Sequence, residues 1–280
     1  MTFLVLAVGV QVAMAMLLKI GELYQQDRLV VMGFNYLVAA FVTLIAWAVQ
    51  GTGLPGPATL VLGPVAGIFY ALGLFLWMGA IASAGLGMAT TALRLAVLWP
   101  TLLSLLAFGE TPSLAQRAGV TLTFVVLGLL CLHSLRVGRA RPGHGGSGWL
   151  LATFCINGGV GIAQKLFIEW GHPAEKSALL ALIFVTAALT SGAPMLGRRR
   201  RLRRSDLVRG SLFGAGNVLS NALLLLGLER VPGVVAFPFA SVGMILLTSV
   251  SGIVLWHERP GPLGLSAIAL AGVAIVTMLR

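Results

Sequence analysis

The sequence predicts an all-α integral membrane protein of ten transmembrane helices, arranged as two inverted five-helix repeats. Three observations lead to this prediction: the composition, the lengths of the apolar segments and an internal repeat. Of the 280 residues, 58% are hydrophobic and only 10% are charged, whereas a soluble domain carries about 25% charged residues. A soluble core of this size cannot bury so much apolar surface, and a bilayer removes the difficulty because lipid surrounds the fold.

Ten apolar segments have the length of about 17–25 residues that a bilayer-spanning helix needs. Short breaks rich in glycine, proline and glutamate separate most of them. The break between the third and fourth segments, from Ser83 to Gly87, contains only small residues and depends on the repeat described below. The predicted spans are 2–20, 29–49, 60–82, 87–108, 113–134, 148–168, 176–196, 207–228, 232–256 and 261–279.

The basic residues are distributed unevenly between the two sides of the predicted bundle. Formal net charge is +11, and six arginines crowd into the loop at 198–204. Thirteen of the nineteen lysines and arginines fall in loops on the side opposite the termini, and such loops face the cytoplasm. We therefore expect a multi-pass protein of the cell (inner) membrane with both termini outside. The basic loops fit anionic lipid rather than nucleic acid. The first segment has no positive residues before it, so we expect it to be retained as a helix rather than cleaved as a signal peptide.

One phrase recurs in the two halves of the chain. Residues 108–112 (Phe-Gly-Glu-Thr-Pro) correspond to residues 256–260 (Trp-His-Glu-Arg-Pro) at an offset of 148. Lys19 and Lys165 align at an offset of 146, each late in its span. These offsets predict a first repeat at 1–134, a basic linker at 135–147 and a second repeat at 148–280.

An odd number of spans in each repeat has a topological consequence. The second repeat must enter the membrane from the opposite side, so the two repeats are inverted. Inverted repeats are typical of transporters that work by alternating access, with a solute site near the membrane midplane where the repeats meet.

The short motifs at the helix joints resemble those of the drug/metabolite transporter superfamily, and most closely the EamA-type transporters. The matching residues are Gly109, Glu110, Pro112, Gln116 and Gly119 in the first half, and Glu258 and Pro260 in the second. The second half departs from the pattern at His257 and Gly264. The resemblance implies a secondary transporter or exporter with a central cavity between the halves. Its known substrates are diverse and include amino acids, sugars, nucleotide sugars, sugar phosphates and drugs.

Arg94 is the most informative polar residue of the sequence. It lies about 5 Å from the middle of its predicted span, where an arginine costs about 2.5 kcal/mol or more unless it faces a cavity or a partner. Thr90, Arg94, Thr101 and Ser104 have spacings that place them along one helix face. A guanidinium beside hydroxyl groups suits a carboxylate, sulfate or phosphate. The alternative is an arginine satisfied by backbone carbonyls or by an acid such as Glu110.

Pro100 and Pro238 lie inside the fourth and ninth spans. Each removes a backbone donor and favours a kink that frees carbonyl groups. The two positions do not correspond in the repeat, so the two halves need not bend alike.

Further polar side chains within the spans are candidates for the lining of the solute site. Interhelical hydrogen bonds are the alternative explanation for each of them, and Lys165 is also close enough to a helix end to snorkel. Asn217 and Asn221 are one helical turn apart and form a plausible amide pair. Besides Arg94, Thr90 and Thr101, the predicted substrate-binding residues are Gln11, Asn35, Tyr36, Asn157, Lys165, Asn217 and Asn221.

The sequence contains no pattern typical of an enzyme. No aspartate or glutamate lies deep in a predicted span, and no phosphate-binding Gly-Lys-Ser/Thr loop is present. Cys131 and His133 cannot form a metal site alone, and Cys131 and Cys155 both lie in apolar segments. We therefore expect no catalytic residues, no metal and no cofactor.

The function that we expect is secondary transport of a small metabolite by alternating access, with export favoured. The solute is anionic or zwitterionic, such as an amino acid, if Arg94 binds it. The alternatives are a lipid-handling protein or enzyme acting on an anionic lipid head group and, less favoured, a channel. The sequence leaves open the solute, the coupling ion and the oligomeric state.

Overall fold

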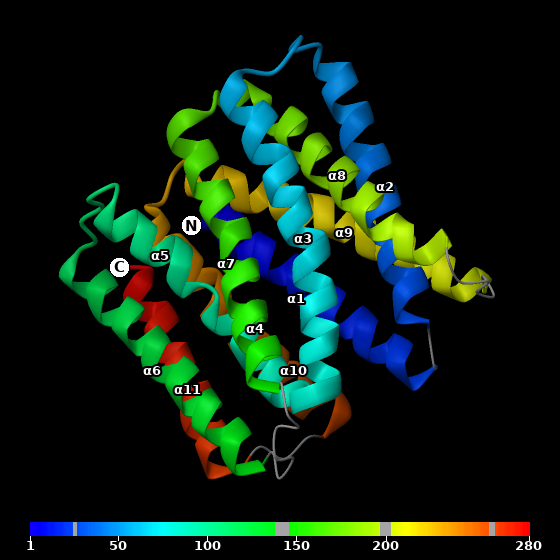
Figure 1. Cartoon of the computed structure of the whole chain (residues 1–280). Coiled ribbons are helices and arrows are strands. Elements are labelled where there is room, and N and C mark those ends of the chain that lie inside the picture. Colours follow the sequence, from blue (N-terminus) through cyan, green and yellow to red (C-terminus); the bar gives the residue numbers. More distant parts are fainter. Residues whose placement is uncertain (25–26, 138–145, 197–202, 258–260) are drawn as a thin grey trace.

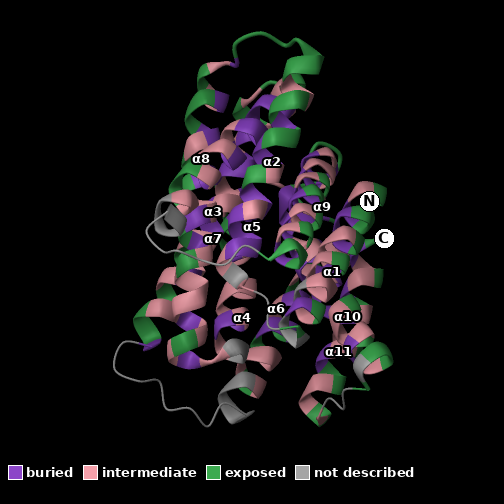
Figure 2. Ribbon diagram, turned by 90° about the vertical axis from the view of Figure 1, so that its right-hand side faces the viewer, coloured by how far each residue is buried: buried purple, intermediate pink, exposed green. Residues whose placement is uncertain are grey.

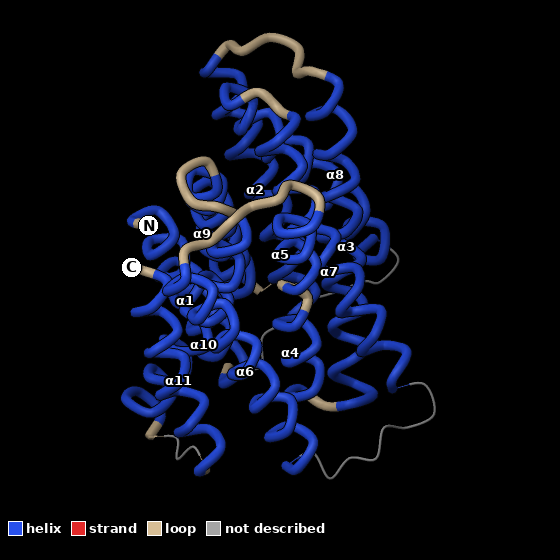
Figure 3. Tube along the Cα trace, turned by 90° about the vertical axis from the view of Figure 1, so that its left-hand side faces the viewer, coloured by secondary structure: helices blue, strands red, loops and turns tan. Residues whose placement is uncertain are grey.

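The computed structural model describes residues 1–24, 27–137, 146–196, 203–257 and 261–280, and all regular structure in these ranges is helical (Figures 1 and 3). Nine segments within them are long and apolar enough to cross a membrane, and α11 is a shorter apolar helix. These helices indicate a multi-pass membrane protein. The elements are α1 Thr2–Leu23, α2 Arg28–Gln50, α3 Pro57–Ala84, α4 Leu86–Leu95, α5 Leu98–Leu106, α6 Leu114–Val137, α7 Gly146–Trp170, η1 Pro173–Glu175, α8 Lys176–Leu196, α9 Arg204–Leu228, α10 Gly233–Trp256 and α11 Pro262–Met278.

Large apolar side chains cover much of the outside of the bundle, where Figure 2 shows exposed and partly buried residues alternating along the helices. Phe41, Leu189 and Val254 are 66%, 72% and 65% exposed. A soluble monomer rarely exposes apolar surface on this scale. In a bilayer the same side chains contact lipid, which agrees with the low charge content of the chain.

Local sequence explains where several helices begin and end. Asp27 caps α2, because its carboxylate accepts hydrogen bonds from the backbone N–H groups of Leu29 and Val30. Gly51 ends the same helix with a left-handed φ of 60°, which glycine adopts without steric cost. A single residue, Gly85 with φ 84°, separates α3 from α4, so the helix break lies within the predicted boundary at 83–87.

The predicted fourth span is not one continuous helix, because the chain is interrupted between α4 and α5 at Ala96 and Val97. Pro100 has no N–H group to donate to the carbonyl of Ala96, and this carbonyl instead accepts from the N–H of Trp99 at 3.2 Å. A tightened turn of this kind before a proline interrupts a helix. Pro238, by contrast, lies inside the continuous helix α10. The helix is therefore interrupted before Pro100 and continuous through Pro238.

Most of the close helix packing joins elements that lie far apart in the sequence. Helix α3 packs along α7 and α8, while α9 packs along α1 and α2. Helix α2 lies against α8, α6 against α11 and α5 against α10. Figure 1 shows α6 and α11 side by side at one edge of the bundle. The residues of the two predicted repeats thus form one interleaved helical body.

Two glycine pairs allow close helix contact. A Cβ atom added to Gly67 of α3 would meet Ile183 O, Thr186 Cβ and Ala187 N of α8. One added to Gly214 of α9 would meet Asn35 O, Val38 Cβ and Ala39 N of α2. At Gly63 and Gly210, one turn earlier, the added Cβ atom would in each case meet a Cβ atom and a backbone oxygen of the same neighbouring helix. Small residues at this spacing let membrane helices approach closely.

One end of the bundle carries the turns at 51–56, 107–113, 171–175 and 229–232, and it is here called the terminal face. Contacts connect these turns to one another: Gly56 N–H donates to Glu175, Lys176 pairs with Glu229, and Gly233 N–H donates to Glu110. Arg230 lies over the ring of Phe3 at 4.8 Å, which places the N-terminus at the same face. The C-terminus lies close to the N-terminus in Figures 1 and 3.

Some sequence predictions fall on residues outside the described ranges. These residues are Glu258 and Pro260 of the repeated phrase, residues 138–145 of the basic linker and Arg198–Arg201 of the arginine-rich loop.

Candidate functional site

A network of buried amide groups lies at mid-depth in the bundle. Asn217 Nδ2 donates to Asn35 Oδ1 at 3.2 Å, and Asn221 Nδ2 donates to Asn217 Oδ1 at 2.8 Å. Asn221 Oδ1 accepts from Gln164 Nε2 at 2.8 Å and from the hydroxyl of Tyr70 at 2.6 Å. All three asparagines and Gln164 are buried. We call these five residues the amide network.

The amide network joins four helices that come from both predicted repeats. Asn35 belongs to α2 and Tyr70 to α3, whereas Gln164 belongs to α7 and the other two asparagines to α9. Tyr70 and Asn217 each lie near the middle of their helices. The hydroxyl of Tyr36 extends the network by donating to the backbone carbonyl of Tyr70 at 3.2 Å, and the two rings meet edge to face with centroids 6.5 Å apart. The network therefore lies where the predicted repeats meet.

Arg94 stands apart from this network in its bonding. It lies deep in the fold, in the last turn of α4 just before the helix break, and its side chain keeps intermediate exposure. Among the residues that the structure describes, its guanidinium makes no hydrogen bond or ion pair. The partial negative charge at a helix C-terminus favours a cation there. A guanidinium at this depth without an acidic partner is available to an anionic group of a solute.

The stripe predicted from Thr90, Arg94, Thr101 and Ser104 assumed one continuous helix, and the break at Ala96 divides it. Thr90 and Arg94 belong to α4, whereas Thr101 and Ser104 belong to α5. Thr101 is buried and its hydroxyl donates to the carbonyl of Val97 at 2.8 Å, as is common for threonine in helices. Ala96 and Val97 keep right-handed helical dihedral angles in a tightened turn, so the stripe is not set by the periodicity of a single regular helix.

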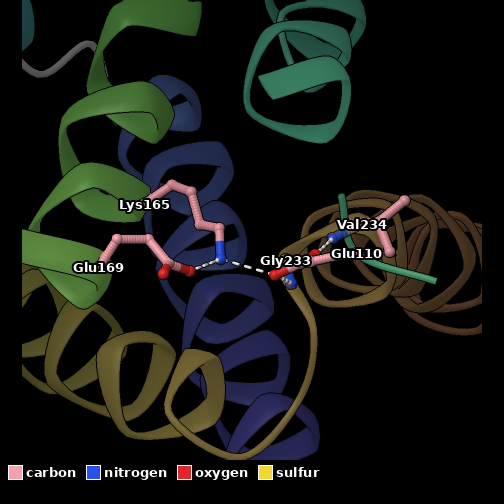
Figure 4. A network of polar contacts seen from close by, with 5 residues as sticks. All are labelled: Glu110, Lys165, Glu169, Gly233 and Val234. Carbon is pink, nitrogen blue, oxygen red and sulfur yellow. Dashed lines mark hydrogen bonds and ion pairs between the residues drawn. The ribbon is translucent and has the colours of Figure 1, made fainter. Parts of the chain in front are cut away.

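Lys165 lies in a second polar site, at the terminal face (Figure 4). Its ammonium group pairs with Glu110 Oε1 at 2.6 Å and with Glu169 of its own helix. Glu110 also accepts hydrogen bonds from the N–H groups of Gly233 and Val234, at 3.0 and 2.7 Å, at the start of α10. A carboxylate at a helix N-terminus is stabilised by the helix dipole. Lys165 therefore already has two acidic partners in this conformation, and Glu110 is engaged with Lys165 rather than with Arg94.

The remaining predicted residues lie outside both sites. Asn157 donates to the carbonyl of Thr153 on its own helix at 2.8 Å and packs against Gly73 of α3. Gln11 and Thr90 are partly buried, and neither side chain makes a hydrogen bond to another described residue.

The sequence gives Gln164 as a further polar residue inside a span, although it is not among the predicted substrate-binding residues above. Tyr70 is the member of the amide network that the sequence prediction missed. Tyr70 gave a weaker signal, because tyrosine in membrane helices is usually read as a packing or interfacial residue. Glu169 was also missed at the second site, although its i,i+4 spacing from Lys165 was a usable signal.

The chemistry available at mid-depth is hydrogen bonding by amides and phenols, together with one arginine. Within the described ranges, no group of three or more His, Cys, Asp or Glu residues is placed to hold a metal ion.

Comparison with known proteins establishes only the fold. No family model matches the sequence, and no curated protein matches it. Among solved structures, one crystal structure aligns with 99% of this chain and 97% of its own, with a TM-score of 0.76 and 17% sequence identity. The chain therefore shares its overall fold, over nearly its whole length, with a protein of known structure.

Proposed function

We propose that the chain is a secondary transporter of a small anionic or zwitterionic metabolite, such as an amino acid, and that it works by alternating access. In this proposal it has ten spans, with α11 as the tenth and α4 with α5 as the fourth. Helix α11 has 17 residues, at the short end of the range of about 17–25 for a span, and it packs along α6. We also propose membership of the drug/metabolite transporter superfamily as an EamA-type protein.

The observation that carries the proposal is the exchange of packing contacts between the two halves. Gly67 and Gly214 are 147 residues apart, and the residues that they contact are 148 apart: Ile183 and Asn35, Thr186 and Val38, Ala187 and Ala39. A Cβ atom added to either glycine would meet the same three atom types: a backbone oxygen, a Cβ and a backbone nitrogen. A contact that recurs with its two partners exchanged is what two inverted repeats related by a two-fold axis in the membrane plane produce.

Polar contacts at the two ends of these helix pairs repeat the pattern. Glu175 accepts from Thr59 at one end, and Asp206 accepts from the N–H of Asp27 at the other. Glu175 is 148 residues after Asp27, and Asp206 is 147 after Thr59. This repetition supports inverted halves independently of the glycine contacts.

The class of solute is proposed from the two mid-depth features. Arg94 offers a cation that makes no ion pair with any described residue. The amide network offers donors and acceptors close to the interface of the halves. No described aspartate or glutamate lies deep in a helix at this level, which disfavours a purely cationic solute. We further propose that both termini lie on the outer, non-cytoplasmic side of the cell membrane and that the transporter exports its solute.

A solute screen followed by transport measurement tests this function. Purified protein is screened by thermal shift against amino acids, sugar phosphates, nucleotides and quaternary amines, and stabilising compounds are then assayed for exchange in proteoliposomes. Because a hydrogen bond to a charged group contributes about 1.5–3 kcal/mol, Arg94→Ala should slow exchange by about tenfold or more, with Arg94→Lys intermediate.

The matched control for Arg94 is Arg117→Ala. It removes an arginine from an exposed position near the terminal face, where the side chain donates to the carbonyl of Pro112 and, within the described ranges, to nothing else. Exchange should persist at the wild-type rate. If the Arg94→Ala and Arg94→Lys proteins both move every transported solute as fast as the wild type, Arg94 does not bind the solute and this part of the proposal is wrong. If no compound of the panel is exchanged while an anionic lipid is bound and modified, the lipid-handling alternative replaces the proposal.

A further inference from the structure

The second polar site connects the two halves of the molecule at the terminal face. We call Glu110, Lys165, Glu169, Gly233 and Val234 the Glu110 cluster (Figure 4). Glu110 lies in the turn between α5 and α6 of the first half, and the other four residues belong to α7 and α10 of the second. The carboxylate of Glu110 receives every contact that links the halves within this cluster.

The charges in the Glu110 cluster are arranged so that Lys165 would not be left without an acidic partner if Glu110 moved away. The side chain of Lys165 is 3% exposed and that of Glu110 is 15% exposed, so their ion pair is partly shielded from water and is stronger than a surface pair. A buried ammonium that loses its only partner destabilises a protein severely. Lys165 avoids this outcome because Glu169 lies one turn further along the same helix and remains bonded to it.

The side chains beneath the ion pair are tightly packed. A Cβ atom added to Gly233 would meet Ser104 Oγ and the Cδ and Cε atoms of Lys165. Ser104 is fully buried, and its hydroxyl has no hydrogen-bond partner among the residues that the structure describes. The residue 148 positions before Gly233 is Gly85, at the opposite face, and no described atom lies within 4 Å of the Cβ position of Gly85. Among the described residues, the position at the terminal face is therefore tightly packed and no packing contact is seen at its equivalent.

Other contacts between the halves occur at both faces and do not share this asymmetry. The hydrogen bonds of Glu175 to Gly56 and Thr59 at the terminal face correspond to the contact of Asp27 with Asp206 at the opposite face. Contacts present at both ends fit a scaffold that stays together throughout a transport cycle.

We propose that the Glu110–Lys165 ion pair is a latch that holds the terminal face closed, and that the conformation described here is the one closed at that face. This proposal rests on the proposed transport by alternating access. Opening of the terminal face separates Glu110 from Lys165 and from the start of α10. Lys165 then keeps Glu169, while Glu110 becomes hydrated at the mouth of the opened pathway.

The test uses a cysteine reporter and needs no solute. Cys131 and Cys155 are replaced by alanine, and Ser104→Cys is introduced beneath the latch. Purified protein in detergent is treated with a bulky hydrophilic maleimide, and the labelling rate is measured. Glu110→Gln and Lys165→Met should each raise this rate by about tenfold or more, because each removes a charged hydrogen bond that exists only in the closed form. Combining the two should add little, since both break the same pair.

Glu175→Gln is the matched control. It neutralises a glutamate that also bridges the halves at the terminal face, but whose contacts belong to the scaffold that is present at both faces. Labelling of the reporter should therefore stay at the background rate. Labelling that remains unchanged in both latch variants, or that rises equally in Glu175→Gln, overturns the proposal.

A second measurement leaves the latch residues unaltered. In the same background, Ser104→Cys with Gly233→Cys should form a disulfide under mild oxidation, as measured by the loss of free thiols, and a pair that stays reduced contradicts the closed packing. These readouts separate the two proposals. Faster labelling of the latch variants without exchange of any solute in the panel supports the latch and contradicts the proposed transport. Solute exchange with unchanged labelling supports transport and contradicts the latch.

Discussion

At the scale of single residues, the interior of the bundle uses neutral polar groups where charge would be costly. Asn221 donates to Asn217 and accepts from Tyr70 and Gln164. Amides both donate and accept, so they satisfy one another without water, whereas a carboxylate at the same depth would need a cation. Arg94 is the exception, and the same reasoning makes it the best clue to the charge of the solute.

Asn221→Ala should lower the stability of the fold, because it leaves the phenol of Tyr70 and the amide of Gln164 without their shared acceptor. A buried group left unsatisfied costs about 1–3 kcal/mol. Asn157→Ala is the control, since the one hydrogen bond of its amide within the described part of the chain is to the carbonyl of Thr153 on its own helix. Thermal unfolding in detergent should show a larger fall in Tm for Asn221→Ala. Equal falls would mean that the network adds nothing to stability across helices.

The sequence predicted part of the candidate site at this scale. Asn35, Asn217 and Asn221 were recognised because amides inside apolar spans are unusual, and the structure brings them together. Tyr70 was not recognised, because its hydroxyl matters only through a partner 151 residues away. The ion pair of Lys165 with Glu110 depends on how two distant turns pack, and spacing along the chain does not encode that contact.

At the scale of elements, hydropathy and helix-breaking residues explain most of the helices. Most predicted spans coincide with described helices, because a spanning helix needs an apolar stretch of bilayer length bounded by residues such as Gly51 or Pro57. The fourth predicted span is divided into α4 and α5. The break between α4 and α5 follows from Pro100, although the proline in α10 leaves that helix continuous. A proline thus indicates where a kink is possible, and the packing of neighbouring helices decides whether the helix is interrupted.

Gly67→Val should destabilise the fold, because its side chain would collide with the backbone of α8 at Ile183 and with Thr186. Overpacking of this kind costs about 1–3 kcal/mol. Gly128→Ala is the control, since no described atom lies within 4 Å of its Cβ position and alanine favours a helix over glycine by about 1 kcal/mol. Thermal unfolding should show a lower Tm for Gly67→Val and an equal or higher one for Gly128→Ala. A Gly67→Val protein as stable as the wild type would contradict the close packing of α3 on α8.

At the scale of the whole molecule, the two halves are interleaved rather than set beside each other. The strongest packing of α3 is with α7 and α8, and that of α9 is with α1 and α2. The sequence predicted the repeat from one phrase and a set of offsets, but it contained no information on which helix faces meet. The contacts at Gly67 and Gly214 show which faces meet, and they support the proposed repeat because the contact at one recurs at the other with its partners exchanged.

Alternating access of inverted halves makes a specific demand on distances at the two faces. Leu114 and Arg230 lie at the terminal face, and Pro262 and Ala82 are the residues that the offset of 148 relates to them at the opposite face. Opening one face should close the other, so distances in the two equivalent pairs must change in opposite directions.

The most direct test is the measurement of these two distances by spin labels on cysteine pairs at 114/230 and 262/82, in separate proteins without the native cysteines. Distance distributions are recorded in liposomes with and without the solute that the screen identifies. The account predicts that the solute shifts the two distributions in opposite directions, one pair separating as the other approaches. Distances that stay fixed, or that lengthen together while solute is bound, would contradict alternating access by inverted halves.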